Sequence, residues 1–256
     1  MASPFAALHR PGQPFLLPNA WDVVSAALLV DAGFPAVGTT SLGVAASAGL
    51  PDAAGATRDQ TLVLARRLAR LPALVTVDIE AGFSDDPGQV AALVAELHDY
   101  GVVGINIEDG RGDTLAPVDV QTRLIATVRS AVPDIFINAR TDAYWLHLDR
   151  PFPETLTRVV AYRDAGADGV FVPGVRDPAE IEAVVRVADR PVNLLADRPL
   201  PELAALGVAR VSCGSLLYRH AVHTAMAVAR ALAAGQAPPT AGPSYADVTR
   251  LLGTAD

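Results

Sequence analysis

The sequence predicts an α/β protein built as a (β/α)8 TIM barrel, and three observations support this. Short apolar runs alternate with helical stretches along most of the 256 residues. A glycine recurs where a helical stretch gives way to the next apolar run, as at Gly33, Gly101, Gly166 and Gly207, which suits the left-handed end of a helix. Strict alternation predicts parallel strands, and eight such units in about 230 residues favour a closed barrel. No junction reads Gly-x-Gly-x-x-Gly, which disfavours a doubly wound sheet.

The expected elements follow from these runs. We expect strands at residues 15–19, 36–40, 74–79, 103–108, 135–140, 169–173, 191–195 and 209–213. We expect helices at about 22–32, 59–70, 87–100, 118–131, 153–165, 178–188, 200–206 and 215–234, and a short last helix at about 244–252 after the Ala/Pro/Gly-rich segment 237–243. The chain is therefore expected to form a single barrel domain over residues 1–256, with a short C-terminal helical extension at about 237–256.

Composition excludes several classes of function. The net charge of −8 argues against a nucleic-acid partner. All basic residues are arginine, so Schiff-base chemistry and a lysine-based P-loop are excluded. The single cysteine, Cys213, excludes a disulfide framework, suits a cytoplasmic location and is expected to be a buried core residue. No apolar run reaches the roughly 18 residues of a membrane span, and no signal-peptide core is apparent, so no membrane association is expected.

Two successive strands are expected to end in acidic side chains. Asp78 and Glu80 follow the apolar run 74–77, and their spacing along an extended strand places both on one face. Glu108 and Asp109 end the next strand. Carboxylates gathered in apolar surroundings repel one another unless a cation or a proton joins them. Any one acid could instead cap a helix, but the cluster favours a hard-cation site, and oxygen ligands without His or Cys suit Mg²⁺ or Mn²⁺ rather than zinc.

Arg140 is the one cation expected beside this acidic cluster. Its guanidinium could bind a substrate carboxylate or phosphonate through two hydrogen bonds, or it could form a structural ion pair with Asp142 or Glu108.

Hydroxyl groups follow the second expected strand at Thr39, Thr40 and Ser41. They could bind a second anionic group together with backbone N–H groups, or they could begin a helix or turn.

His9 is expected in a mobile N-terminal segment.

Several short motifs are specific in combination: Leu17-Pro18-Asn19-Ala20-Trp21-Asp22, Ala32-Gly33-Phe34, Gly38-Thr39-Thr40-Ser41, Asp78-Ile79-Glu80-Ala81-Gly82-Phe83, Gly104-Ile105-Asn106-Ile107-Glu108-Asp109 and Asn138-Ala139-Arg140-Thr141-Asp142. Together they resemble the isocitrate lyase/phosphoenolpyruvate mutase superfamily, over roughly residues 14–235. The resemblance implies a barrel whose eighth helix is swapped onto a neighbouring subunit, in homodimers or homotetramers. It also implies bound Mg²⁺, with Mn²⁺ as the alternative, and chemistry on 2-oxo or 2-hydroxy acids through a metal-stabilised enolate.

The resemblance also implies roles for individual residues. Asp78 would bind the metal directly, while Glu80 and Glu108 would hold metal-bound waters, and Asp52 matches a further acid near the metal. Glu80 is one methylene longer than the aspartate often found at its position. The resulting candidates are Arg140, Asp52 and Glu108 as catalytic residues, Thr39, Thr40, Ser41, Arg140 and Asn19 as substrate-binding residues, and Asp78, Glu80 and Glu108 as metal-binding residues.

The loop at residues 110–117 departs from the known members. The lyases that cleave isocitrate and methylisocitrate carry a Lys-Lys-Cys-Gly-His loop after the fourth strand, whose cysteine donates a proton, and the phosphonate mutases carry a longer lid with lysine and asparagine. Here the loop is short and has no lysine, cysteine or histidine. The sequence therefore resembles the phosphonopyruvate mutase-like branch without the lyase cysteine loop.

The function expected from these features is a Mg²⁺-dependent C–C bond lyase or decarboxylase that acts on a small 2-oxo diacid such as oxaloacetate. Decarboxylation needs no acid on the leaving group, which suits a loop without the cysteine. One alternative is hydrolysis or mutation of the P–C bond in a phosphonopyruvate-like substrate. Another is a barrel that binds an oxo acid without turnover. The expected partner is a small oxo or hydroxy acid, with no nucleic acid.

Overall fold

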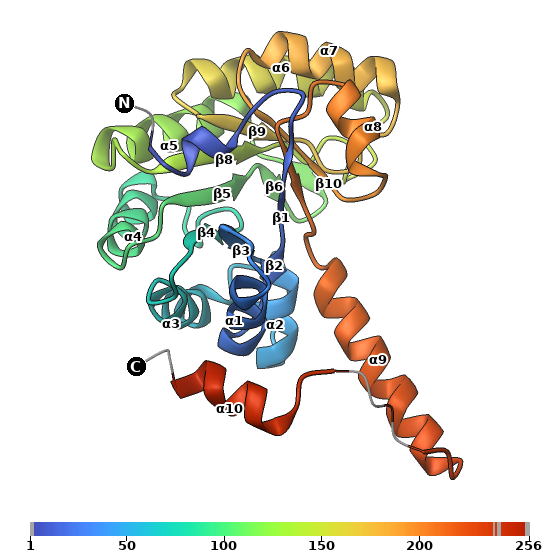
Figure 1. Ribbon diagram of the computed structural model, residues 1–256. Coiled ribbons are helices and arrows are strands. Elements are labelled where there is room, and N and C mark those ends of the chain that lie inside the picture. Colours follow the sequence, from blue (N-terminus) through green and yellow to red (C-terminus); the bar gives the residue numbers. More distant parts are fainter. Residues whose placement is uncertain (1–2, 238, 240–241, 254–256) are drawn as a thin grey trace.

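The computed structural model describes residues 3–237, 239 and 242–253, and a parallel β-barrel lies at its centre (Figure 1). The strand order is β1-β11-β10-β9-β8-β5-β4-β3-β2. β1 (Phe15–Leu17) and β2 (Asn19–Ala20) are two parts of one extended segment separated by Pro18. β1 pairs with β11 and β2 pairs with β3, both in parallel. Because β1 and β2 belong to one segment, these pairings close the sheet into a barrel. The predicted barrel is confirmed.

The other barrel strands are β3 (Ala36–Thr39), β4 (Leu74–Asp78), β5 (Gly104–Glu108), β8 (Phe136–Arg140), β9 (Gly169–Phe171), β10 (Val192–Leu195) and β11 (Arg210–Ser212). The helices are α1 (Val23–Asp31), α2 (Ser41–Ala48), α3 (Arg58–Leu68), α4 (Pro87–Asp99), α5 (Val118–Ala131), α6 (Pro151–Asp164), α7 (Pro178–Ala188), α8 (Leu200–Ala205), α9 (Leu216–Ala233) and α10 (Tyr245–Gly253). Each predicted strand and helix is present, with ends within two residues of the expected positions.

Four elements lie outside the predicted strand and helix ranges. These are α2, the 3-10 helix η1 (Ala6–Leu8), and an antiparallel hairpin of β6 (Gly110–Arg111) with β7 (Thr114–Leu115). Helix α2 confirms the alternative in which residues after Thr39 begin a helix, although the Thr40 side chain makes no capping hydrogen bond. The hairpin occupies the short loop at residues 110–117.

The N-terminal segment closes the amino-terminal end of the barrel, and the expectation that His9 is mobile is wrong. Phe5 is fully buried and His9 is 8% exposed. The His9 ring stacks on Phe136 with centroids 4.2 Å apart, and Phe5 and Phe15 meet it edge-on. Because Phe15 and Phe136 begin β1 and β8, this aromatic cluster lies at the opposite end of the barrel from the strand ends that carry the acids.

Side chains alternate between the two sides of each barrel strand, and the two sides differ in polarity. Side chains such as Val77, Ile105 and Ile137 are buried in an apolar cluster with residues of the surrounding helices. The intervening positions point into the barrel, and several of them are polar, including Thr76, Asn106 and Asn138. The barrel interior is therefore partly polar, which is relevant to the site above it.

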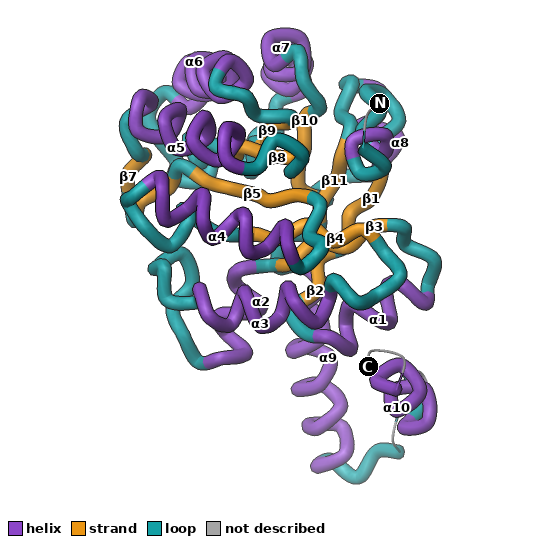
Figure 2. The backbone as a smooth tube through the Cα atoms, turned by 90° about the vertical axis from the view of Figure 1, so that its left-hand side faces the viewer, coloured by secondary structure: helices purple, strands orange, loops and turns teal. Residues whose placement is uncertain are grey.

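Helices α9 and α10 lie outside the compact barrel layer (Figures 1 and 2). Helix α9 extends away from the barrel, and none of its residues is buried. Helix α10 packs beside α1, where Leu251 joins the apolar cluster and Arg250 pairs with Asp31 at 3.5 Å. The segment 237–243 lies partly outside the described residues. Within the part of the chain that the structure describes, no helix is long and apolar enough to cross a membrane.

Candidate active site

A cavity of about 310 Å³ opens at the carboxyl ends of the strands. Most of the residues predicted for the site line it, namely Asn19, Thr40, Ser41, Asp52, Asp78, Glu108 and Arg140. Their convergence follows from the parallel topology, which brings the carboxyl ends of all strands to one rim. Thr39 and Glu80 do not line this cavity.

Asp78 ends β4 and is held by hydrogen bonds with Thr39 and Glu80. Its N–H donates to Thr39 Oγ1 at 2.8 Å, and its Oδ1 accepts the Glu80 N–H at 3.0 Å. Burial raises the pKa of Asp78, Arg140 opposes this rise, and the carboxylates of Glu80 and Asp52 add to it. Asp78 therefore carries its negative charge at a free-energy cost that a cation in the cavity would reduce.

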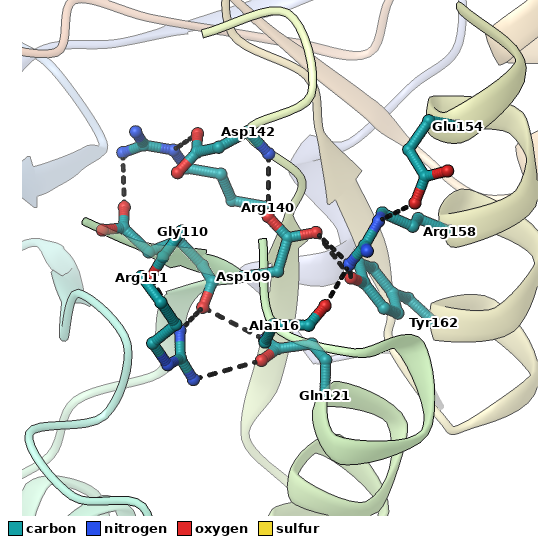
Figure 3. Close-up of polar contacts among 11 residues, drawn as sticks. Asp109, Gly110, Arg111, Ala116, Gln121, Arg140, Asp142, Glu154, Arg158 and Tyr162 are labelled. Carbon is teal, nitrogen blue, oxygen red and sulfur yellow. Dashed lines mark hydrogen bonds and ion pairs between the residues drawn. The ribbon is translucent and has the colours of Figure 1, made fainter. Parts of the chain in front are cut away.

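Arg140 lies between two carboxylates (Figure 3). Its Nη1 is 2.7 Å from Glu108 Oε2, and its Nε donates to Asp142 Oδ1 at 2.6 Å. The predicted alternative of structural ion pairs is thus present. Burial raises the pKa of Glu108, Arg140 opposes the rise, and Asp78 and Asp142 add to it. Among the described residues no side chain or carbonyl accepts a hydrogen bond from Nη2 of Arg140, and the guanidinium lies 5.7 Å from the Trp145 ring centroid.

Glu80 does not share a strand face with Asp78, contrary to the expectation from their spacing. β4 ends at Asp78, and Glu80 has a left-handed backbone with φ of 50°. Its carboxylate accepts hydrogen bonds from the Thr57 hydroxyl at 2.6 Å and from the Gly55 N–H at 3.0 Å. Glu80 lines a neighbouring hollow of about 410 Å³ together with Arg111 of the hairpin.

Asp109 points away from the cavity and has a structural role (Figure 3). Its Oδ2 accepts hydrogen bonds from Arg158 Nη1 at 3.0 Å and from the Tyr162 hydroxyl at 2.6 Å, both on α6. Its Oδ1 accepts the Asp142 N–H at 2.8 Å. Glu108 and Asp109 alternate along the chain, so one faces the barrel interior and the other faces the helices. Asp109 thereby fixes the backbone that carries Asp142.

The remaining predicted residues divide into two groups. Thr39 is buried and holds the backbone of Asp78, so its hydroxyl is already occupied. The Asn19 amide donates to the Thr39 carbonyl at 2.7 Å and accepts the N–H groups of Cys213 and Gly214, each at 2.9 Å. Thr40 and Ser41 lie at the cavity wall where α2 begins. A direct substrate contact by Asn19 or Thr39 stays a prediction.

The donor set of this cavity suits a hard divalent cation. Among the residues that the structure describes, no three His, Cys, Asp or Glu side chains gather closely enough to hold a metal directly. Asp78 and Glu108 nevertheless line one cavity, and burial raises the pKa of each. Two such carboxylates, with water completing the coordination, match the way Mg²⁺ is often bound.

The sequence reasoning missed several residues of the cavity wall. These are Asn106, Trp145, Phe171, Arg176, Asp197 and Arg219. Asn106 could have been found, because it lies two residues before Glu108 on β5 and so points to the same side. Phe171 ends β9, Trp145, Arg176 and Asp197 lie in loops, and Arg219 lies in the first turn of α9, so only the assembled barrel brings them to the rim.

Comparisons with known proteins identify the family of this chain. The sequence matches the family "Phosphoenolpyruvate phosphomutase" over residues 5–233. It is 44% identical over 253 residues to an uncharacterized protein of Mycobacterium tuberculosis, covering 97% of this chain and 95% of the relative. It is 32% identical over 236 residues to the oxaloacetate decarboxylase of Marinomonas sp., covering 85% of this chain and 80% of the relative.

Solved structures share the whole fold. The phosphoenolpyruvate phosphomutase from Streptomyces platensis subsp. rosaceus is 25% identical, with a TM-score of 0.86 and coverage of 97% of this chain and 94% of that chain. A phosphonopyruvate hydrolase in complex with oxalate and Mg²⁺ is 26% identical, with a TM-score of 0.84 and coverage of 99% and 95%. The resemblance, the barrel and the expectation of a lyase-type enzyme are confirmed, and the chain belongs to the phosphoenolpyruvate phosphomutase family within the isocitrate lyase/phosphoenolpyruvate mutase superfamily.

Proposed function

We propose that this protein is a divalent-cation-dependent decarboxylase or C–C bond lyase that acts on a small 2-oxo diacid such as oxaloacetate. The observation that carries the proposal is the single cavity that joins Asp78 and Glu108 to the guanidinium of Arg140. Its volume of about 310 Å³ suits a small acid rather than a nucleotide or a polymer. The same cavity thus contains two carboxylates that can attract a metal cation and a guanidinium that can bind an acid substrate.

Asp78 is the proposed direct metal ligand and Glu108 a proposed holder of a metal-bound water, both on the cavity wall, with Mg²⁺ favoured and Mn²⁺ as the alternative. Glu80 remains a proposed holder of a metal-bound water, although its carboxylate is bound by Thr57 and Gly55 here. When bound, the cation would polarise the 2-oxo group of the substrate and stabilise the negative charge that develops as a C–C bond breaks.

The ends of the substrate are proposed to contact two positive regions. Nη2 of Arg140 is available for a carboxylate, since the other nitrogens hold Glu108 and Asp142. The second region is the first turn of α2, whose Ser41 and Leu42 line the same cavity, because backbone N–H groups at the start of a helix have no acceptor within that helix. Asp52 is an exposed acid at the cavity wall, and its proposed role is to exchange protons with the reacting group.

The hairpin of β6 and β7 supports decarboxylation over cleavage that needs a thiol acid. It carries no cysteine, and its Arg111 is engaged by the carbonyls of Glu108 and Gly110 at 3.1 and 2.8 Å. Loss of CO₂ needs no proton on the leaving group, and water can return the proton to carbon. The named activity of the Marinomonas relative, oxaloacetate decarboxylase, supports the same choice.

Hydrolysis of a P–C bond is the second candidate. It is favoured by the likeness to the phosphonopyruvate hydrolase whose structure holds oxalate and Mg²⁺. Oxalate resembles the enolate of pyruvate, which both reactions generate. Binding of an oxo acid without turnover is the third candidate, and the retained acids Asp78 and Glu108 argue against it.

Product analysis tests the proposal. Purified protein with Mg²⁺ is given oxaloacetate or phosphonopyruvate, and the release of CO₂ and of inorganic phosphate is measured. Because Mg²⁺ alone slowly decarboxylates oxaloacetate, the Asp78→Ala protein at the same metal concentration is the control. We expect CO₂ well above this control. Release of phosphate without such CO₂ would assign the P–C reaction, and neither product on a panel of oxo acids would leave only binding.

Two further expectations remain proposals. One is a homodimer or homotetramer in which α9 packs on a neighbouring subunit. The other is a cytoplasmic location, which rests on the single cysteine alone.

A further inference from the structure

A buried arginine lies inside the barrel below the proposed site. Arg210 begins β11 and is fully buried. Its Nη2 donates to Asn106 Oδ1 at 3.0 Å, while Nε and Nη1 are buried without a hydrogen-bond partner among the described residues. Burial lowers the pKa of Arg210 to about 9, and Asp78 partly offsets this. An arginine so placed costs stability, so a role other than packing is indicated.

A ladder of amides crosses the barrel from Arg210. Asn138 Nδ2 donates to Asn106 Oδ1 at 2.9 Å and to Asn193 Oδ1 at 3.1 Å. Asn193 Nδ2 donates in turn to the carbonyl of Leu194 at 2.7 Å. All three asparagines are at least nine-tenths buried, with exposures of 6%, 1% and 1% for Asn106, Asn138 and Asn193. The ladder has room because glycines stand at inward positions, and a Cβ at Gly169 would lie only 3.1 Å from Asn138 Oδ1.

The two ends of the ladder fix the orientation of every amide. A guanidinium can only donate, so the Asn106 atom that faces Arg210 must be its oxygen. A backbone carbonyl can only accept, so Asn193 must turn its nitrogen to Leu194 and its oxygen to Asn138. Asn106 Oδ1 therefore receives two donors, from Arg210 and Asn138.

The consequence is a free donor in the proposed site. Asn106 Nδ2 has no hydrogen-bond partner among the described residues, and Asn106 lines the cavity together with Asp78 and Glu108. Its register neighbours on the adjacent strands are Asp78 and Asn138. An amide N–H₂ in this position faces the space where an oxo acid would sit.

We infer that Asn106 donates a hydrogen bond from Nδ2 to an oxygen atom of the bound oxo acid, and that Arg210 is the positioning residue that holds Asn106 in this orientation. The inference rests on the proposed function for the class of ligand. It assigns Asn106 to substrate binding and gives the buried charge of Arg210 a purpose.

The first test needs no substrate. In the free protein, NMR should show the side-chain N–H₂ protons of Asn106 exchanging with water faster than those of Asn138, whose nitrogen donates to two carbonyl oxygens. The Asn106→Asp protein, which lacks these protons, assigns the signals. In Arg210→Met the protection of Asn106 should change, because its oxygen then keeps only the Asn138 donor of the two that it has in the wild type. Equal protection of Asn106 and Asn138 in the wild type would overturn the inference.

The second test uses oxalate with Mg²⁺, and then oxaloacetate. Oxalate should shift the Asn106 N–H₂ signals. Asn106→Ala should raise KM for oxaloacetate about tenfold to one-hundredfold with a smaller change in kcat, as expected for one lost hydrogen bond to a charged group. Arg210→Met should raise KM similarly, Arg210→Lys should restore much of the loss, and the double variant should be no worse than Asn106→Ala. Asn193→Ala, which cuts the ladder away from the cavity, is the matched control and should keep a near wild-type KM.

The outcomes separate the two proposals. If the wild type binds oxalate but the Asn106 signals stay unmoved and Asn106→Ala binds equally well, the inference fails while the proposed function stands. If the wild type binds no oxalate, the proposed function fails, and the inference is then decided by the exchange rates in the free protein.

Discussion

Arg140 Nη1 lies 2.7 Å from Glu108 Oε2, in a pair whose side chains are 15% and 8% exposed. This contact places a carboxylate proposed for the metal and a cation proposed for the substrate in direct opposition. A carboxylate bound to Arg140 cannot offer both oxygens to water or metal. Entry of a cation and an anion together would exchange this pair for two new ones, with no change in the net charge of the site. If both proposals hold, the ion pair would couple cation binding to acid binding.

The first prediction concerns Asp78. We expect Asp78→Ala and Asp78→Asn to abolish turnover while the protein stays folded, because burial raises the pKa of this carboxyl and its charge does not favour folding. Activity assays and thermal unfolding measure the two effects. Asp119→Asn is the matched control, since its side chain is 75% exposed on α5. Full activity of the wild type in strong chelator would remove the metal proposal.

The second prediction concerns Arg140. Arg140→Met leaves Glu108 and Asp142 buried without their cation, so we expect a loss of about 3–5 kcal/mol in the free energy of unfolding, besides lost turnover. Urea unfolding measures this loss. Arg123→Met removes an exposed pair with Asp119 on α5 and should cost less than about 1 kcal/mol. Equal stability losses in the two variants would contradict a buried network around Arg140.

The strands and most helices could be predicted because their signals are local. A run such as residues 74–78 and a glycine such as Gly33 are visible within a few residues. A helix start after Thr39 was an open alternative, but the range of α2 could not be predicted because its residues, mostly Ala, Gly and Ser around Leu42 and Val44, form no wide apolar stripe.

The site was harder to predict, because its details depend on residues far apart in the sequence. The turn of Glu80 away from Asp78 depends on Gly55 and Thr57, which bind its carboxylate from an earlier loop. The orientation of Asn106 depends on Arg210, which is 104 residues away. Spacing along one strand predicts which face a side chain occupies, but the partner that fixes its atoms comes from another strand.

The third prediction concerns pH and His9. Burial, and then Arg210, lower the pKa of His9 from 6.5 to about 3. The unfolded chain therefore binds a proton at His9 that the folded chain does not, so the stabilisation is complete above about pH 6.5 and is lost progressively as the pH falls toward 3. At pH 4 the cost should be on the order of 3 kcal/mol.

His9→Phe keeps the aromatic packing and cannot titrate. We expect its melting temperature to fall less than that of the wild type between about pH 6.5 and pH 4, a window set by the two pKa values of His9. The groups with raised pKa at the site, such as Glu108, are present in both proteins, so the difference isolates His9. An equal fall of the melting temperature with pH in the two proteins would show that His9 is not buried in its neutral form.

The fourth prediction concerns assembly. Helix α9 has no buried residue and exposes Val222, Met226 and Leu232 by 46%, 50% and 46%. Exposed apolar side chains gathered on a projecting helix are typical of a protein–protein contact. We expect a stable homo-oligomer by light scattering at micromolar concentration, and Met226→Asp should weaken it. Val63→Asp, at a 53% exposed position on α3, should leave it intact. A monomeric wild type is the contrary result.

The last prediction concerns Cys213, the only thiol in the chain. It follows β11, is 9% exposed and lies at the cavity wall, where its N–H donates to Asn19 Oδ1 at 2.9 Å. Burial raises the pKa of the thiol, which makes the reactive thiolate scarce. Its position next to a barrel strand also prevents the movement that a lid residue would allow.

We therefore expect Cys213→Ala to keep most of its activity and an unchanged pH profile, with a stability loss of at most about 1–2 kcal/mol from the small cavity. Steady-state rates across pH and urea unfolding measure these quantities. Cys213→Ser, which keeps the size but not the acidity of the thiol, should behave in the same way if packing is its role. A loss of a thousandfold or more in kcat in both variants, with the fold retained, would make Cys213 the proton donor. The reaction would then require an acid on the leaving group or on carbon, which simple decarboxylation with proton return from water does not.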